Sequence, residues 1–171
     1  MKKNSLLTLV LFIHIAVFGQ FTIQAGKSKY PSTRTWSFAG SGYIGSVDSK
    51  VIVGKIGTGG CLMLSANLES RVQYLRGSIT LILDDTVLVL ANTLSKDIFD
   101  GSPAALYSID AKQYKILRSK EIREIRFEVY SLSLKRNQFF TSSNLVWHEV
   151  DGTKLFLPKY KTSIEIEEVK D

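Results

Sequence analysis

Cysteine and histidine are both scarce in this chain of 171 residues. Cys61 is the single cysteine, so no disulfide can form within the chain and the fold must depend on its core. His14 lies in an N-terminal apolar stretch, which leaves His148 for the rest of the chain. Zinc sites and histidine relays draw on several histidines or cysteines, so we expect no metal and no cofactor.

The sequence also lacks an apolar run long enough to cross a bilayer. The longest stretch, residues 6–18, has thirteen residues, whereas a spanning helix needs about 20. It follows Lys2 and Lys3 and ends in small residues, which is typical of a secretory signal. We predict a signal peptide over residues 1–19, with Ala25 as a second cleavage point. No cysteine follows the stretch, so no lipid anchor is expected, and the protein should be secreted or periplasmic.

Two motifs of nucleotide and ester chemistry are missing as well. No G-x-x-x-x-G-K-[ST] loop and no G-x-S-x-G elbow occurs, so the glycines at 57, 59 and 60 are interpreted as a hairpin turn. That turn would join residues 51–56 to residues 61–67. The remaining histidine, His148, falls in a predicted strand beside Trp147, which favours a structural side chain over a catalytic base.

What the chain does have is the alternation of side chains that is typical of β-strands. Residues 77–92 read GSITLILDDTVLVLAN, two apolar runs split by Asp84 and Asp85. Because side chains alternate along a strand, both faces of this hairpin are apolar, and we predict that it is covered on both sides at the centre of a sheet. The two aspartates are interpreted as a solvated turn, since the following residues supply no further Ca²⁺ ligands.

Other segments fill out the sheet. Trp36 and Phe38 share one side of a predicted strand, and residues 125–129 alternate apolar with charged side chains. The apolar phase slips near Tyr130 and Ser131, which predicts a bulge or a bend. Asp151-Gly152 gives the strongest hairpin signal and would set Glu149 opposite Lys154.

Helical spacing recurs over residues 109–118 alone, and we predict one short helix there, packed on the sheet. Residues 20–34 show no period and are expected to be a flexible leader. Residues 94–107 are expected to be a surface connection, and residues 163–169 an edge strand or a charged tail. The fold class is therefore α+β and β-dominated: one domain over residues 35–169 with a mostly antiparallel sheet of about six to nine strands.

Basic side chains are densest between positions 112 and 136. Removing residues 1–19 lowers the formal net charge from +6 to +4, a mild excess that suits an anionic surface or glycan. The candidate binding face comprises Lys112, Lys115, Arg118, Lys120, Arg123 and Arg126. The competing interpretation is a solvated face whose charges neutralise one another. Phe127 lies on the opposite strand face from Arg126, which argues against a nucleic-acid groove.

The signal peptide, the apolar hairpin and the helix leading into Ile125-Arg126-Phe127 resemble the small exported β-rich proteins of Gram-negative bacteria in a general way. No functional residue is carried over from that resemblance. We expect a non-catalytic binding or surface-interaction module. The alternative is a hydrolase of glycans or peptides that uses carboxylates, which would require acids such as Asp84, Asp85 or Glu149 to line a cleft.

Overall fold

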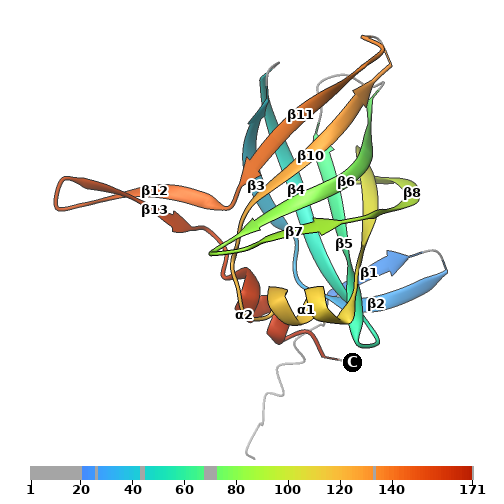
Figure 1. Ribbon diagram of the computed structural model, residues 1–171, viewed down its shortest axis with the longest axis horizontal. Coiled ribbons are helices and arrows are strands. Elements are labelled where there is room, and N and C mark those ends of the chain that lie inside the picture. The colour runs from blue at the N-terminus through green and yellow to red at the C-terminus, as the bar shows by residue number, and fades with distance from the viewer. Residues whose placement is uncertain (1–20, 26, 43–44, 68–72, 133, 171) are drawn as a thin grey trace, which may run out of the picture.

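The computed structural model describes residues 21–25, 27–42, 45–67, 73–132 and 134–170. The predicted signal peptide lies outside the described residues. The chain is strand-dominated, as predicted, with two short helices (Figure 1). In order, the elements are β1 Phe21–Ala25, β2 Ser28–Ser32, β3 Trp36–Gly42, β4 Gly45–Ile56, β5 Gly59–Asn67, β6 Gln73–Leu83, β7 Val87–Leu90, β8 Asn92–Phe99, β9 Ser102–Ile109, α1 Ala111–Leu117, β10 Ile122–Ser131, β11 Arg136–Ser143, β12 Leu145–Val150, β13 Thr153–Pro158 and α2 Thr162–Glu167.

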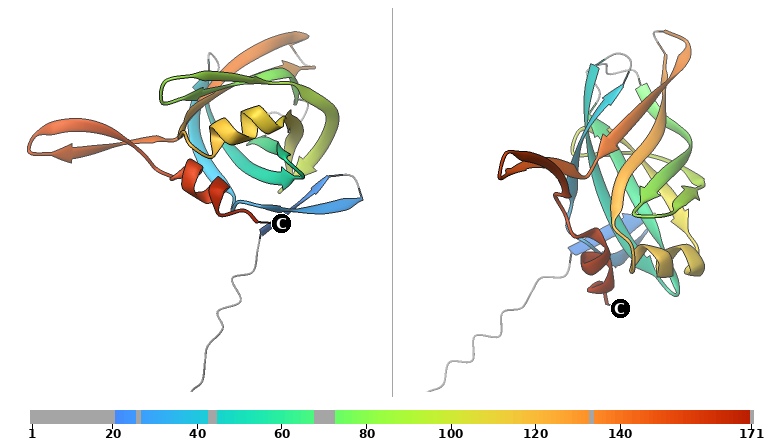
Figure 2. Two further views of the ribbon diagram at one scale, coloured as in Figure 1. Left: turned by 60° about the horizontal axis from the view of Figure 1, so that its bottom comes forward. Right: turned by 60° about the vertical axis from the view of Figure 1, so that its left-hand side comes forward.

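The main sheet is antiparallel and closes on itself. Among the described residues it has 11 strands, more than the six to nine predicted. Nine follow the order β7-β6-β10-β11-β3-β4-β5-β9-β8, and β1 pairs with β2, which pairs with β4. Ala91 alone separates β7 from β8, so the chain passes directly from one end of this order to the other. The Ser108 N–H donates to the Ala91 carbonyl at 3.1 Å where the two ends meet. Both views in Figure 2 show the sheet curving around a common interior.

Side chains fill that interior. Alternation along each strand turns every second residue inward, and the inward set is mostly apolar, with Ser49, Gln138 and Ser142 among its buried polar members. Its largest members include Trp36, Phe38, Leu62, Leu64, Ile79, Leu81, Tyr107, Ile122 and Ile125. α1 covers one end of the closed sheet, where Tyr114 and Leu117 are buried (Figure 2, left). Among the described residues, no helix has both the length and the apolar character needed to cross a membrane.

The helix predicted at 109–118 is confirmed as α1. Asp110 is its N-cap: its carboxylate accepts from the Gln113 N–H at 2.8 Å, and the Gln113 side-chain oxygen accepts from the Asp110 N–H at 3.0 Å. This reciprocal capping box satisfies two amides that the first turn would otherwise leave unpaired. The helix therefore begins one residue after Asp110.

The expectation of a flexible leader is wrong for residues 21–32. β1 and β2 form a hairpin whose Ile23 is buried against the outer face of the sheet. There it joins a second apolar cluster that includes Ile52, Cys61 and Met63. Sequence periodicity missed the hairpin because one buried side chain among polar neighbours leaves no pattern.

The hairpin predicted at 77–92 is present as β6 and β7, with Ile79 opposite Leu90 and Leu81 opposite Leu88. Its inner face is buried, but the prediction of cover on both sides is wrong. Val87 and Val89 point outward and are each 57% exposed. β7 lies at one end of the strand order rather than at its centre.

Three further expectations need correction. Residues 94–107 are not a surface connection, because β8 and β9 pair around Asp100-Gly101, where both φ angles are positive (50° and 72°). The bulge or bend predicted near Tyr130 and Ser131 is instead the end of a strand: β10 stops at Ser131 and β11 begins at Arg136. Residues 163–169 are neither strand nor tail: Thr162, Ile166 and Val169 are buried at helical spacing, and most of the segment forms α2.

Candidate functional site

The six basic residues of the candidate face do not form one free surface. Four have acidic neighbours: Arg118 with Glu167 (3.4 Å), Lys120 with Asp85, Arg123 with Asp84 (2.5 Å) and Arg126 with Glu124 (3.5 Å). Lys112 and Lys115 are exposed on α1. The arrangement matches the interpretation of mutually neutralised charges for most of the set.

Asp84 and Asp85 serve the fold where β7 turns back from β6. The Asp84 carboxylate accepts from the Glu121 N–H at 3.1 Å and from Arg123. Partial burial would raise the pKa of Asp84, but these two donors and the charge of Lys120 outweigh it and hold that pKa below its usual range. Within the described part of the chain, no cluster of three or more His, Cys, Asp or Glu side chains could hold a metal ion.

A hairpin arm, β12 with β13, stands away from the closed sheet (Figure 1). Its register is the predicted one, with Glu149 opposite Lys154 and His148 opposite Leu155. Asp151 and Gly152 take positive φ angles of 50° and 75°, as a tight two-residue turn requires. The arm leaves and rejoins the body at one point, where the Lys159 N–H donates to the Asn144 carbonyl at 2.6 Å.

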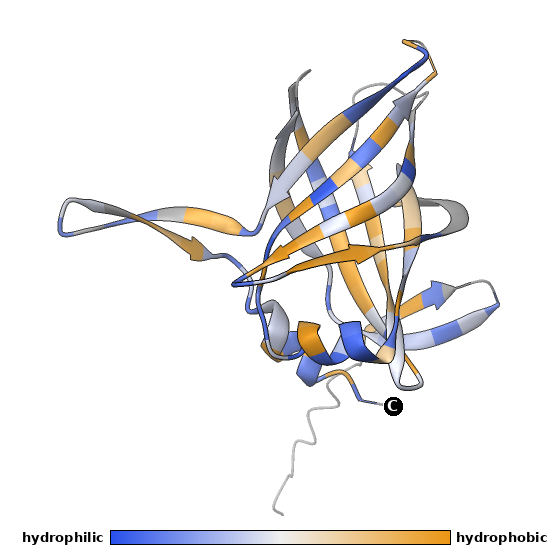
Figure 3. Ribbon diagram, viewed as in Figure 1, coloured by the Kyte–Doolittle hydropathy of each residue, from blue (hydrophilic) through white to orange (hydrophobic). Residues whose placement is uncertain are grey.

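The arm exposes large apolar side chains on both of its faces. Leu155, Phe156 and Leu157 are consecutive, so they alternate between the faces, and all three are exposed, Phe156 to 67%. Figure 3 shows this apolar stretch standing clear of the body. Among the described residues, β12 and β13 pair only with each other, so each has an outer edge of unpaired backbone groups.

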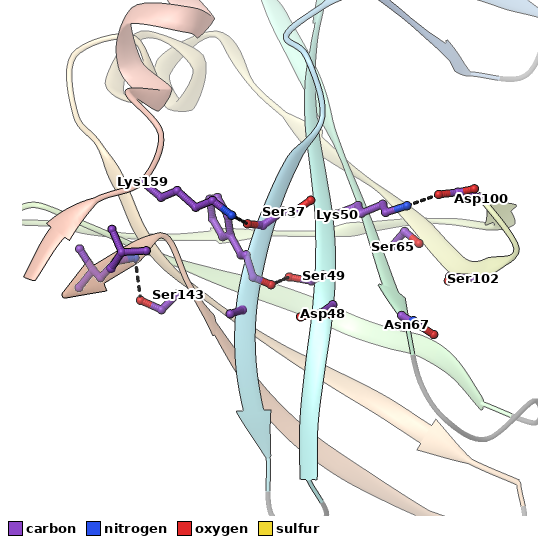
Figure 4. Close-up of a pocket in the computed structure, with 14 residues that line it drawn as sticks. Ser37, Asp48, Ser49, Lys50, Ser65, Asn67, Asp100, Ser102, Ser143 and Lys159 are labelled. Atoms are coloured by element: carbon purple, nitrogen blue, oxygen red, sulfur yellow. Dashed lines mark hydrogen bonds and ion pairs between the residues drawn. The ribbon is translucent and has the colours of Figure 1, made fainter. Parts of the chain in front are cut away.

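A polar cleft of about 490 Å³ lies between the arm's root and the outer face of β3, β4 and β5 (Figure 4). Strand register places Ser37, Lys50 and Ser65 in one row of its floor and Ala39, Asp48 and Asn67 in the next. The β8–β9 turn contributes Asp100 and Ser102 on one side, and the arm's root contributes Leu145, Val146 and Lys159 on the other.

Charges in the cleft are mixed. Lys50 forms an ion pair with Asp100, and this hydrogen bond and charge lower the pKa of Asp100. The Lys159 ammonium donates to the Ser37 carbonyl at 3.5 Å. Asp48 is exposed on β4. The cleft can therefore offer hydroxyl, amide, ammonium and carboxylate groups to a polar ligand.

Two reactive side chains of the sequence lie apart from this cleft. His148 is exposed on the arm. Cys61 is buried beneath the β1–β2 hairpin, and burial raises the pKa of its thiol to about 11. A thiol that stays protonated at neutral pH is a poor nucleophile, as expected for a core cysteine.

Sequence reasoning missed the cleft and the apolar arm for different reasons. The cleft residues come from six separate segments whose meeting depends on how the sheet closes. The arm did carry a signal, because Leu155-Phe156-Leu157 is apolar on both faces of a strand. A comparison of the chain with protein-family models, curated proteins and solved structures found no match.

Proposed function

We propose that this protein is a non-catalytic interaction module and that the β12–β13 arm is its contact surface for a protein partner. The observation that carries the proposal is the exposure of Leu155, Phe156 and Leu157 on a hairpin that, among the described residues, pairs with no other strand. Proteins seldom leave adjoining large apolar side chains in water unless a partner covers them.

The arm's energetics support the same proposal. An isolated two-stranded hairpin is marginally stable in water, since it has no third element on which to bury a face. Contact with a partner buries apolar area at roughly 25 cal/mol per Å² and can add a strand to either open edge. The arm's stability and its recognition of a partner are thus linked.

A carboxylate-dependent hydrolase is the second candidate, because Asp48 and Asp100 line one cleft. A general acid of that kind needs a raised pKa, produced by burial or by a second nearby carboxylate. Asp100 has the opposite environment, an exposed site beside Lys50 that lowers its pKa. The arm therefore supports the binding function more strongly than the cleft supports catalysis.

Export is part of the proposal. Cleavage after Gly19 would leave β1 intact, whereas cleavage after Ala25 would remove β1 and with it the buried Ile23. We therefore place the cut after Gly19 and the folded chain in the periplasm or outside the cell. N-terminal sequencing of the exported protein tests this, and a start at Gly26 would contradict it.

Site-specific photo-crosslinking tests the contact surface. A benzophenone amino acid at position 156 should give a discrete crosslinked product with a partner protein in the source cells. The matched control is position 164, since Ile164 is also a large exposed apolar residue but lies on α2. Equal crosslinking from positions 156 and 164, or none from 156, would reject the arm as the contact surface.

A further inference from the structure

A second exposed apolar surface lies at the end of the closed sheet opposite α1, where β10 turns into β11 (Figure 1). We call it the β10–β11 end and define it by Tyr130, Leu132, Leu134, Lys135, Arg136 and Phe139. Leu132 and Leu134 are each about half exposed, and Phe139 is 72% exposed, the highest value among the large apolar side chains described.

Strand register places aromatic side chains beside one another on this outer face. Tyr74, Tyr130 and Asn137 form one row across β6, β10 and β11, and Arg76, Glu128 and Phe139 form the next. The Tyr74 and Tyr130 rings are 5.4 Å apart, and the Arg76 guanidinium lies 5.4 Å from the centre of the Tyr130 ring. Phe139 is a diagonal neighbour of Tyr130, within reach of an aromatic side chain.

The charge of this end is positive. Lys135 and Arg136 are exposed in and after the turn and form no ion pair with a described carboxylate. Among the described residues, these two and Arg76 are three cations near one carboxylate, Glu128. Cations of the candidate face differ from these, because four of those six are paired with acids.

We propose that the β10–β11 end docks on the surface of an anionic lipid bilayer. Leucine and phenylalanine side chains at a projecting turn can enter the interfacial region, where their apolar area leaves water. Tyrosine suits the boundary itself, with an apolar ring and a polar hydroxyl. Arginine and lysine behind the apolar tip contact lipid phosphates, each adding attraction that salt screens.

Lipid explains this end better than a protein partner does. The arm has two open edges and a continuous apolar strand, whereas β10 is paired along its length with β6 and β11. Among the described residues, β11 pairs with β3 only over residues 140–143, so just the short stretch of residues 136–139 lacks a second strand neighbour. What remains available is a convex tip of side chains, which fits a soft, deformable surface rather than a complementary pocket.

Vesicle sedimentation tests the docking surface, using residues 20–171, which contain every described element. We expect binding to phosphatidylcholine vesicles with roughly 30% phosphatidylglycerol at about 0.05 M salt, and much weaker binding to phosphatidylcholine alone or at about 0.5 M salt. Leu134→Ser with Phe139→Ser should lower the partition coefficient on the order of tenfold or more. The variant Lys135→Gln with Arg136→Gln should lower the partition coefficient about fivefold for each cation removed.

The matched control is Lys27→Gln with Lys29→Gln, which removes the same charge from exposed positions of the β1–β2 hairpin, outside the β10–β11 end and outside the candidate face. Binding of this control should stay close to that of the unaltered chain. No binding to anionic vesicles, or equal losses in the control and in the tip variants, would overturn the proposal. So would a dimer in vesicle-free buffer that Phe139→Ser converts to a monomer, because the patch would then join two copies of the chain.

Discussion

Gly60 marks the tightest packing at the scale of single residues. A Cβ atom at this position would lie 2.3 Å from the Gly54 carbonyl oxygen and 2.9 Å from the Tyr114 ring, so neither the neighbouring strand nor α1 leaves room for it. Gly57 differs, since its φ is +56° but no atom lies within 4 Å of an added Cβ.

We predict that Gly60→Ala destabilises the protein by about 3 kcal/mol, because the clash involves backbone. Gly57→Ala should cost about 1 kcal/mol, the price of a side chain at positive φ. Chemical denaturation of both variants checks the difference. Equal losses would mean that the strands and α1 are packed less tightly than described.

The buried thiol predicts a pH effect. Burial raises the Cys61 pKa from 9.0 to about 11, although a backbone hydrogen bond at Gly54 partly offsets it. Between those values the unfolded chain loses the thiol proton first, so stability is intact below about pH 9 and falls as pH rises through 11. The loss should reach roughly 2 kcal/mol at about pH 10.5. The free energy of unfolding of Cys61→Ala, measured over the same pH range, should lack this loss. If it changed with pH as steeply as that of the unaltered chain, burial of the thiol would be contradicted.

At the scale of elements, α2 shows how a short helix is held by its surroundings. It has six residues and no side-chain N-cap of its own. Glu121 accepts instead from the Ser163 N–H and hydroxyl, and Glu165 accepts from the Trp36 indole at 2.8 Å and from Arg34. Tertiary contacts of this kind leave no trace in local periodicity, which is why the segment was predicted as a strand or tail.

Glu165→Ala should therefore destabilise the protein by about 2 kcal/mol, because it leaves the buried Trp36 indole N–H without an acceptor. Glu167→Ala is the control on the same helix: Glu167 is exposed and pairs with Arg118 at 3.4 Å, so its loss should cost less than about 0.5 kcal/mol. Thermal unfolding measures both, and a Glu165 effect no larger than the Glu167 effect would contradict the anchoring role.

Hairpins were predictable where the turn residues carried the signal. Asp151-Gly152 and the glycines near 57 located two of them, and helical spacing over residues 109–118 located α1. Asp100-Gly101 carries the same Asp-Gly signal, but it falls in a segment interpreted as a surface connection, and β8 and β9 were missed. Local chemistry thus specified two turns, and a third turn with the same residue pair was overlooked.

At the scale of the whole molecule, closure of the sheet was not predictable. Closure depends on Ala91, through which the chain passes directly from β7 to β8, the first and last strands of the sheet order. The Ala91 carbonyl accepts there from the Ser108 N–H of β9. The consequence for function is direct. The interior is filled by side chains, so the surfaces available for recognition are outside: the arm, the polar cleft at its root and the β10–β11 end.

The central claim is that the arm serves a partner and not the fold. The direct test removes residues 147–156 and joins Val146 to Leu157 by Asn-Gly. The cross-strand pair Val146 and Leu157 lies four residues nearer the arm's root than the pair Val150 and Thr153, which flanks the native turn. Because pair types alternate along antiparallel strands, both pairs have the same hydrogen-bonding type and accept the same two-residue turn. Denaturation should give a free energy of unfolding within about 1 kcal/mol of the full chain. A loss above about 3 kcal/mol would show that the arm belongs to the fold.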